Sequence, residues 1–283
     1  MPGVTSCYFV VRPLPLRKMD FLTEIMALKR ARLERAKRER PAEELRARAE
    51  DVRRTAPEHA LRLALDNDGR VNVIAEFKRA SPSKGIIRAG ADPTLIAREY
   101  EAGGAAAISV LTEEDRFQGS LDDLRAASAA AKIPVLCKDF LFDEYQLHEA
   151  AAAGADALLL IVAALDDDTL CRLRRVAEDE LHLDALVEVH TKDELRRAEA
   201  TGATLVGVNN RDLHSFKVSL EVSIELAQAA APHITLVAES GLKSGDDIRK
   251  LRALGYSGFL VGESLMRASR PEQVLRDLIG AGE

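Results

Sequence analysis

Apolar and polar positions alternate along residues 71–78, a pattern typical of a β-strand. One set of alternate positions is apolar throughout, whereas the other ends in Glu76 and Lys78. Because successive side chains of a strand point to opposite faces, these two charges share one face. Burying either charge unpaired would be costly, so the pattern favours a binding or catalytic pocket. The alternative is an exposed edge strand with one solvated face.

A similar unit recurs after residue 70: a helix rich in alanine and leucine ends at a glycine, and a short apolar strand follows. Glycine is expected there because the residue after a helix C-cap often requires a positive φ. The expected strands are 71–78, 105–111, 133–138, 155–162, 184–189, 205–208, 234–238 and 258–261. Helix start signals lie between strands at Asp92, Ser120, Thr191 and Ser244.

Strict alternation of buried strands and helices predicts an α/β protein with a parallel sheet. Eight such units favour a (β/α)8 TIM barrel, which usually needs about 250 residues. The chain has 283 residues. No Gly-rich dinucleotide fingerprint follows the first strand, which weighs against an open doubly wound sheet. We therefore expect a single barrel domain over residues 19–283, with extra N-terminal helices.

The segment ahead of the barrel divides into two parts. Residues 1–18 lack periodicity, so we expect a disordered arm. From Asp20 a helical pattern begins, with one apolar side and one basic side. The apolar residues are Phe21, Ile25, Leu28 and Leu33. The basic side is either an anion-binding or partner-binding surface or a solvated face, and we favour the solvated face. Pro41 starts a second helix that extends to about Arg54.

Charge and composition exclude several classes of protein. The net charge of −6 argues against a dedicated binder of nucleic acid or anionic membranes, which would favour excess positive charge. No apolar run approaches the roughly 20 residues that span a bilayer. Cys7, Cys137 and Cys171 fit reduced thiols in the cytoplasm. Neither the cysteines nor the six histidines have metal-ligand spacing, so we expect no metal site.

Polar residues stand where five of the expected strands end. They are Lys138, Glu188, Asn209 followed by Arg211, Glu239, and Glu263. One such residue would usually be a solvated rim residue. Their joint occurrence at C-terminal strand ends, where barrel enzymes carry their active sites, favours one site that also includes Glu76 and Lys78. Lysines, carboxylates and an amide without a nucleophile arrangement predict acid/base chemistry.

The last two strands are followed by loops that suit a phosphate. The segments Ser240-Gly241 and Gly262-Glu263-Ser264 can offer backbone N–H groups, and the second opens a short helix. Ser81, in the loop after the first strand, can add a hydroxyl. For each glycine taken alone, simple turn chemistry is the alternative.

Six segments together resemble the indole-3-glycerol phosphate synthase family of tryptophan biosynthesis. They are Ile74–Gly85, Lys138–Phe140, Glu188–His190, Asn209–Leu213, Ala238–Gly241 and Gly262–Met266. The resemblance extends from about residue 20 to the C-terminus. It implies a carboxy-lyase that converts 1-(2-carboxyphenylamino)-1-deoxyribulose 5-phosphate to indole-3-glycerol phosphate. Carbon dioxide and water are lost, and neither a metal nor an organic cofactor is used.

The resemblance also implies roles for individual residues. Those in catalytic positions are Lys138, Lys78, Glu76, Glu188, Asn209 and Glu239. Lys138 resembles the general acid of ring closure, Lys78 a holder of the substrate carboxylate or an acid in dehydration, and Glu76 the general base. Glu188 resembles a second acid/base, and the remaining two fix the lysines and substrate hydroxyls. Substrate-binding positions are Ser81, Phe117, Phe140, Arg211, Ser240, Gly241, Gly262 and Glu263.

Two positions depart from the family pattern. Arg116 stands where an aromatic residue is frequent, and Cys137 stands where an arginine is frequent. If Lys138 points into the barrel, Cys137 points away from it.

Ring closure needs an acid near the substrate ketone, and we expect a desolvated lysine beside another cation to have a pKa lowered toward neutrality.

Other functions remain open at this point. A Schiff-base aldolase would use Lys138 or Lys78 as a covalent nucleophile. A phosphoribosyl isomerase would share the phosphate end, and a non-enzymatic scaffold would bind a partner through the basic N-terminal helix. We expect a cytoplasmic monomer that acts on a phosphorylated small molecule, with neither nucleic acid nor membrane as a partner.

Overall fold

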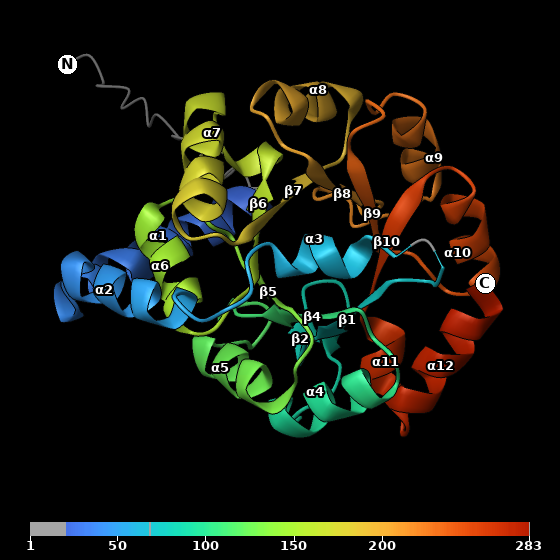
Figure 1. Ribbon diagram of the computed structural model, residues 1–283, viewed down its shortest axis with the longest axis horizontal. Helices are drawn as coiled ribbons and strands as arrows, with labels where there is room; N and C mark the ends of the chain where they lie inside the picture. Colours follow the sequence, from blue (N-terminus) through green and yellow to red (C-terminus); the bar gives the residue numbers. More distant parts are fainter. Residues whose placement is uncertain (1–20, 68, 283) are drawn as a thin grey trace, which may run out of the picture.

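Eight parallel strands form a closed barrel in the computed structural model, which describes residues 21–67 and 69–282. Around the ring their order is β1-β10-β9-β8-β7-β6-β5-β4, so each strand pairs with its neighbour in the chain. Figure 1 shows helices surrounding this ring. The (β/α)8 barrel predicted from the alternation is confirmed. The expected arm over residues 1–18 lies outside the described residues.

The elements occupy the following ranges. The barrel strands are β1 (Val73–Phe77), β4 (Ala107–Leu111), β5 (Val135–Lys138), β6 (Ala157–Ile161), β7 (Asp184–Val189), β8 (Leu205–Asn209), β9 (Thr235–Glu239) and β10 (Tyr256–Val261). A hairpin of β2 (Ala80–Ser81) and β3 (Gly85–Ile86) lies in the loop after β1. The helices ahead of β1 are α1 (Phe21–Glu39), α2 (Ala42–Arg53) and α3 (Ala60–Leu65). The later helices are α4 (Pro93–Ala102), α5 (Leu121–Ala130), α6 (Glu144–Ala152), α7 (Asp167–Arg175), α8 (Lys192–Ala200), α9 (Glu221–Ala227), α10 (Gly245–Arg252), α11 (Glu263–Arg267) and α12 (Pro271–Gly282). A 3₁₀ turn, η1 (Val162–Ala164), follows β6, and a π-helical turn, η2 (Val176–Glu180), extends α7.

Local signals explain where the helices begin and end. The four expected start residues cap α4, α5, α8 and α10, because the side-chain oxygen of each accepts a backbone N–H of the first turn. The glycines after four helices have positive φ between 83° and 94°: Gly104, Gly154, Gly202 and Gly255. Both features were predicted, and both make the turn from helix to strand short.

Each strand separates two apolar layers. On β1, Val73, Ala75 and Phe77 pack in the layer between the strands and the helices, whereas Ile74 packs inside the barrel. The same alternation on β5 places Cys137 in the outer layer and Leu136 inside. Cys137 therefore points away from the interior, as expected. Period-2 geometry then directs the charged residues at the strand ends inward.

Helices pack against both ends of the barrel. Leu61 and Leu65 of α3 pack against the interior layer, and Figure 1 shows α3 lying across one end of the ring. This is the N-terminal end, since the backbone N–H of Arg62 donates to Asp184 at the start of β7. Ile25 of α1 joins the interior layer beside Phe140, which follows β5 at the opposite end.

The basic side of α1 differs from the solvated face that we favoured. Lys29 is buried and binds Asp139 at 2.8 Å and Glu114 at 3.3 Å, while Arg32 binds Asp115 at 2.7 Å. These carboxylates belong to the loops after β4 and β5, about 80 to 110 residues later in the chain. The solvated-face interpretation holds for Arg30, Arg35, Lys37 and Arg38, which are exposed. It is wrong for Lys29, because it considered only acidic neighbours on the helix itself.

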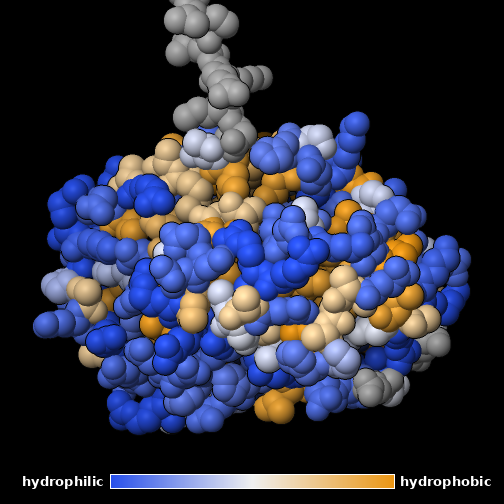
Figure 2. Space-filling view, turned by 90° about the horizontal axis from the view of Figure 1, so that it is seen from above, coloured by the Kyte–Doolittle hydropathy of each residue, from blue (hydrophilic) through white to orange (hydrophobic). Residues whose placement is uncertain are grey.

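The apolar side of α1 also differs in one position. Leu28 is 36% exposed, and Met26 is buried instead. Figure 2 shows one face of the molecule, on which hydrophilic side chains predominate and apolar side chains gather mainly in the upper part of the view. Within the described residues, no helix combines the length and the apolar character needed to cross a bilayer.

Candidate active site

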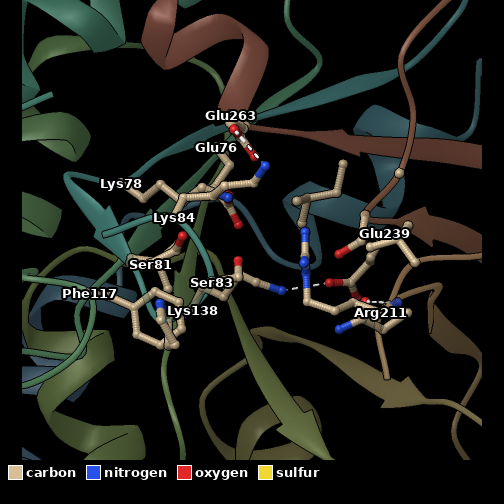
Figure 3. Close-up of a pocket in the computed structure, with 18 of the residues that line it drawn as sticks. Glu76, Lys78, Ser81, Ser83, Lys84, Phe117, Lys138, Arg211, Glu239 and Glu263 are labelled. Atoms are coloured by element: carbon tan, nitrogen blue, oxygen red, sulfur yellow. Dashed lines mark hydrogen bonds and ion pairs between the residues drawn. The ribbon is translucent and has the colours of Figure 1, made fainter. Parts of the chain in front are cut away.

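A cavity of about 790 Å³ opens at the C-terminal ends of the barrel strands. Its lining includes every residue that the sequence indicated as catalytic or substrate-binding. These are Glu76, Lys78, Ser81, Phe117, Lys138, Phe140, Glu188, Asn209, Arg211, Glu239, Ser240, Gly241, Gly262 and Glu263. Figure 3 shows many of their side chains around this single pocket. The edge-strand alternative for β1 is wrong, since β1 pairs with β10 on one side and β4 on the other.

Four ionisable residues come from alternate strands of the ring. Glu76 is on β1, Lys138 on β5, Glu188 on β7 and Glu239 on β9. Side chains from alternate strands form one layer inside a barrel of this kind. The layer nearest the mouth is therefore charged, whereas apolar residues such as Leu136 fill the barrel below it.

Lysines pair the carboxylates of this layer. The Lys138 ammonium lies 2.5 Å from a Glu239 oxygen and 3.6 Å from a Glu188 oxygen. Lys78, just beyond the end of β1, donates a hydrogen bond to Glu76. Glu76, Glu188 and Glu239 expose 5% or less of their side chains, so these pairs are shielded from water.

Two glycines on the intervening strands make room for the carboxylates. A Cβ added to Gly207 of β8 would lie 2.1 Å from Oε1 of Glu239. A Cβ added to Gly262, just after β10, would lie 2.2 Å from Oε1 of Glu76. Both distances are far below van der Waals contact, so any other residue at either position would displace a carboxylate.

The pKa values of Lys138 and Glu239 in this layer differ from those of isolated side chains. Burial lowers the pKa of Lys138, but the charges of Glu239, Glu188 and Glu76 outweigh burial and raise it above the usual value. Burial also raises the pKa of Glu239 to about 7 despite the adjacent lysine, and the two other carboxylates contribute to this rise. The expected lowering toward neutrality is wrong for Lys138, because carboxylates surround it more closely than any second cation.

Glu76 has the opposite shift. Burial raises the pKa of its carboxyl, but Lys78, Lys138 and Arg211 outweigh burial and hold the pKa below its usual value. Glu76 is therefore an anion at neutral pH, whereas Glu239 titrates near neutrality. Neighbouring carboxyls with separated pKa values suit a site that moves protons.

Aromatic rings form one wall of the cavity. The rings of Phe21 and Phe140 are 6.1 Å apart, those of Phe117 and Phe140 6.4 Å, and those of Phe21 and Phe216 5.5 Å. Phe117 and Phe140 were predicted from the sequence. Phe21 begins α1 and was interpreted only as part of its apolar side, and Phe216 was not recognised. Such a wall favours a planar aromatic group.

The loop after β8 is held by its own polar residues. Oδ1 of Asn209 accepts a hydrogen bond from the backbone N–H of Arg211 at 3.0 Å. The guanidinium of Arg211 donates to the carbonyl of Phe216 at 3.2 Å. The amide of Asn210 donates to the carbonyls of Glu239 and Ser240, both at 3.1 Å. Asn210 thus joins the ends of β8 and β9, a role that its sequence position beside Asn209 did not reveal.

The opposite side of the cavity carries the loops expected to bind phosphate. Ser240 and Gly241 both have positive φ, and Gly262 is the N-cap of α11 as the sequence predicted. Lys84, Lys243 and Arg267 also line the cavity; Lys243 is in the loop after β9, and Arg267 ends α11. Figure 3 shows Lys84 reaching Glu263, at 3.8 Å. The additional cations increase the attraction for an anion, and the sequence reading had not included them.

Arg116, one of the two unusual positions, is outside the cavity lining. It binds Glu24 of α1 and so ties the loop after β4 to the N-terminal helix. In the same loop, Glu113 accepts backbone hydrogen bonds from Asp115, Arg116 and Phe117. These bonds fix the backbone that presents the Phe117 ring to the cavity.

Comparison with known proteins identifies the family. The family model described as indole-3-glycerol phosphate synthase matches residues 22–278. The chain belongs to this family. The indole-3-glycerol phosphate synthase of Koribacter versatilis is 49% identical over 253 residues, which cover 88% of this chain and 97% of the relative. That of Carboxydothermus hydrogenoformans is 43% identical over 263 residues, which cover 92% and 99%.

Solved structures that resemble this chain in shape share its fold alone. The 3-hexulose-6-phosphate synthase of Salmonella typhimurium has a TM-score of 0.59 at 14% identity, covering 74% of this chain and 96% of its own. The thiamine phosphate pyrophosphorylase of Pyrococcus furiosus has a TM-score of 0.53 at 19% identity, covering 74% and 93%. Membership of the indole-3-glycerol phosphate synthase family, which the motifs indicated, therefore rests on sequence.

Proposed function

We propose that this protein is a carboxy-lyase that converts 1-(2-carboxyphenylamino)-1-deoxyribulose 5-phosphate to indole-3-glycerol phosphate. The observation that carries the proposal is the charged layer of Glu76, Lys138, Glu188 and Glu239, which lies between an aromatic wall and cationic, glycine-containing loops. The substrate has matching parts: an aromatic carboxylate at one end, a ketone in the middle and a phosphate at the other end.

Binding both ends of the substrate favours ring closure. In this proposal Phe117, Phe140 and Arg211 hold the aryl end, with Phe21 and Phe216 completing the wall. The phosphate lies among Ser81, Ser240, Gly241, Gly262 and Glu263, where backbone N–H groups are the main donors. Fixing the flexible chain at both ends lowers the entropy lost when the ring carbon meets the ketone carbon.

Lys138 is the proton donor of ring closure in this mechanism. Its ammonium form is secured by three carboxylates, so a proton is available at neutral pH. As the ring carbon attacks the ketone, negative charge develops on the ketone oxygen and the oxygen becomes basic enough to take that proton. Glu239, 2.5 Å from the ammonium, holds it in place.

Decarboxylation and loss of water complete the reaction. Lys78 holds the substrate carboxylate or protonates the departing hydroxyl, and Glu76 is the general base. Glu188 is a second acid/base that faces the same space, and Asn209 orients substrate hydroxyls. These roles are the ones that the family resemblance implies, and they are supported by the fact that all four residues line one cavity.

A Schiff-base aldolase is disfavoured by the charge of Lys138. A covalent amine nucleophile must be neutral, and such lysines lie in apolar pockets or beside other cations. Lys138 instead lies among three carboxylates that raise its pKa. A phosphoribosyl isomerase would not need the paired Lys78 and Lys138.

We propose that neither a metal nor an organic cofactor takes part. The carboxylates of the layer are already paired with ammonium groups, which repel cations. We also propose a cytoplasmic location, since Cys137 and Cys171 are free thiols. A monomer without nucleic-acid or membrane partners remains our expectation.

A turnover assay tests the function directly. Purified protein is mixed with the carboxyphenylamino substrate, and indole fluorescence is followed against a low background, because the chain contains no tryptophan. Fluorescence should rise, and prior dialysis against a strong chelator should leave the rate unchanged. No rise at micromolar enzyme would refute the function, whereas a rate lost on dialysis and restored by a divalent ion would refute the metal-free mechanism.

A further inference from the structure

His190 lies beside Glu188 of the charged layer and is absent from the cavity lining. It follows β7, whose penultimate residue is Glu188, and precedes α8. Its Nε2 lies 3.5 Å from Oε1 of Glu188, and its Nδ1 lies 3.2 Å from Oε2 of Glu194. The same Glu194 oxygen accepts the backbone N–H of His190 at 2.7 Å. The imidazole thus stands between two carboxylates.

The two ring nitrogens of His190 differ in their hydrogen bonding. Nδ1 has Glu194 as a hydrogen-bond partner, whereas Nε2 is buried without a partner among the described residues. Burying a ring nitrogen without a hydrogen-bond partner costs free energy, so its occurrence calls for an explanation. Oε1 of Glu188 is 3.5 Å from Nε2, so a small rotation of either side chain would complete a hydrogen bond.

Glu188 itself lacks a short contact. Its Oε2 is 3.6 Å from Lys138 Nζ, while Glu239 takes the close position on that ammonium. Its Oε1 lies at a comparable distance, 3.5 Å, from Nε2 of His190. A carboxylate held between Lys138 and the His190 ring at these distances keeps its orientation and still has lone pairs free for a substrate proton.

We propose that His190 is a positioning residue that orients the Glu188 carboxylate for proton transfer and is itself held by Glu194. The inference rests on the proposed function, because it assigns a support to one residue of that mechanism. With Glu194 accepting from Nδ1, the proton on Nε2 decides whether the ring donates to Glu188 or presents a lone pair to it.

The charges around His190 favour the donating form. Glu188 on β7, Glu194 on α8 and Glu239 on β9 raise the pKa of its ring above 6.5, although burial lowers it. Arg197 on α8 acts on Glu194, and Lys138 on β5 acts on Glu188; both oppose this effect at longer range. As pH rises through the pKa of His190, Nε2 loses its proton and can no longer donate to Glu188.

Three variants and a matched control test the role by kinetics. His190→Ala should lower kcat on the order of 10- to 100-fold with little change in KM, as a small misplacement of a catalytic group does. His190→Gln keeps a donor that does not titrate, so it should recover part of kcat and stay active at higher pH than wild type. Glu194→Gln should move the basic limb of the kcat profile to lower pH. His148→Ala removes another buried histidine, on α6, outside the cavity lining, and should leave kcat and its profile unchanged.

Histidine NMR tests the contact without using activity. The His190 signal, identified by its absence from the His190→Gln spectrum, should titrate above pH 6.5 and move to lower pH in Glu188→Gln. This measurement and Glu194→Gln decide the question if His190→Ala does not fold. Titration unaffected by Glu188→Gln would overturn the inference.

The kinetic outcomes separate two failures. If the wild type is active and His190→Ala has the same kcat and the same pH profile, the inference is overturned and the proposed function is left intact. A wild type that forms no indole product would refute the proposed function itself, and the inference that rests on it.

Discussion

The ammonium of Lys138 lies 2.5 Å from the carboxylate of Glu239, although β5 and β9, which carry these residues, are not neighbours in the barrel. Glu188 and Glu76 also act on Lys138, so its positive charge is balanced by more than one carboxylate. With Lys78 paired to Glu76, three carboxylates share two lysines. Burial is the main cause of the raised pKa of Glu239, about 7, and the charges of Glu188 and Glu76 add to it, so the site holds a proton that it can exchange near neutral pH.

The pKa of Glu239 predicts a pH-dependent stability difference. A carboxyl whose pKa rises from 4.5 to about 7 on folding favours the folded state below pH 4.5, and this contribution is lost as pH rises to about 7. Glutamine does not ionise, so the variant Glu239→Gln has no such pH-dependent loss of stability. Relative to wild type, the variant should gain stability between pH 4.5 and 7, by at most about 3 kcal/mol at about 1.4 kcal/mol per pH unit. Urea unfolding at several pH values measures it, and a constant difference would contradict the assignment.

Gly207 predicts a loss of activity from a single methyl group. The Cβ of Gly207→Ala would lie 2.1 Å from Oε1 of Glu239, so the carboxylate must move away from Lys138. We expect kcat to fall about 100-fold, the cost of displacing a group in the reaction by about 1 Å. Gly280→Ala, with no atom near the added Cβ, should leave kcat unchanged and gain about 0.5–1 kcal/mol in α12. Equal kcat in both variants would refute the role of Gly207.

The buried pair of Lys29 and Asp139 predicts a stability effect at the junction of α1 and the barrel. Lys29→Met leaves Asp139 without its cation, although Thr112 and the N–H of Phe140 still donate to it. We expect a loss of about 3 kcal/mol, typical of breaking one side of a buried pair. Arg32→Met breaks an exposed pair with Asp115 and should cost less than about 1 kcal/mol. Similar urea midpoints for the two variants would contradict this account.

Phe21 predicts an effect on binding rather than on chemistry. Phe21→Ala removes the ring that contacts both Phe140 and Phe216, so the aryl end of the substrate loses part of its wall. KM should rise about tenfold, since a lost aromatic contact costs about 0.5–1.5 kcal/mol beyond its buried area. Leu28→Ala, at an exposed position on the same helix, should leave KM unchanged. A fall in kcat without a change in KM would place Phe21 elsewhere in the mechanism.

Much of the fold could be predicted because its signals are local. The alternation on β1, the caps such as Ser120 and the glycines such as Gly154 each depend on neighbours within a few residues. The charged strand ends could be assembled because a parallel barrel brings all C-terminal ends to one side. For these reasons the sequence indicated the residues of the cavity before the geometry was known.

What could not be predicted depends on distant partners. Lys29 looked solvated because Asp139 lies 110 residues away, and the pKa of Lys138 was expected to fall because its carboxylate neighbours are on other strands. The place of Phe21 in the aromatic wall follows from how α1 crosses the barrel mouth, which periodicity does not show. Loop cations such as Lys84 carried no pattern that marked them.

The role of Lys138 is the centre of this account, and one comparison on matched preparations tests it. Lys138→Ala removes the proposed proton donor, whereas Lys132→Ala removes an exposed lysine outside the cavity. A positioned general acid contributes about 10²- to 10⁴-fold, so kcat of Lys138→Ala should fall by that factor, while Lys132→Ala should match wild type.

The same preparations show whether only the chemistry is lost. Affinity for a phosphate-bearing product analogue should stay within a few-fold of wild type, and the variant should remain folded at the assay temperature, with a lower thermal midpoint because Glu188 and Glu239 lose their cation. The deciding measurement is kcat of Lys138→Ala: a fall of about 10²-fold or more in a folded protein that still binds the analogue supports the account, and a kcat near that of wild type would contradict it.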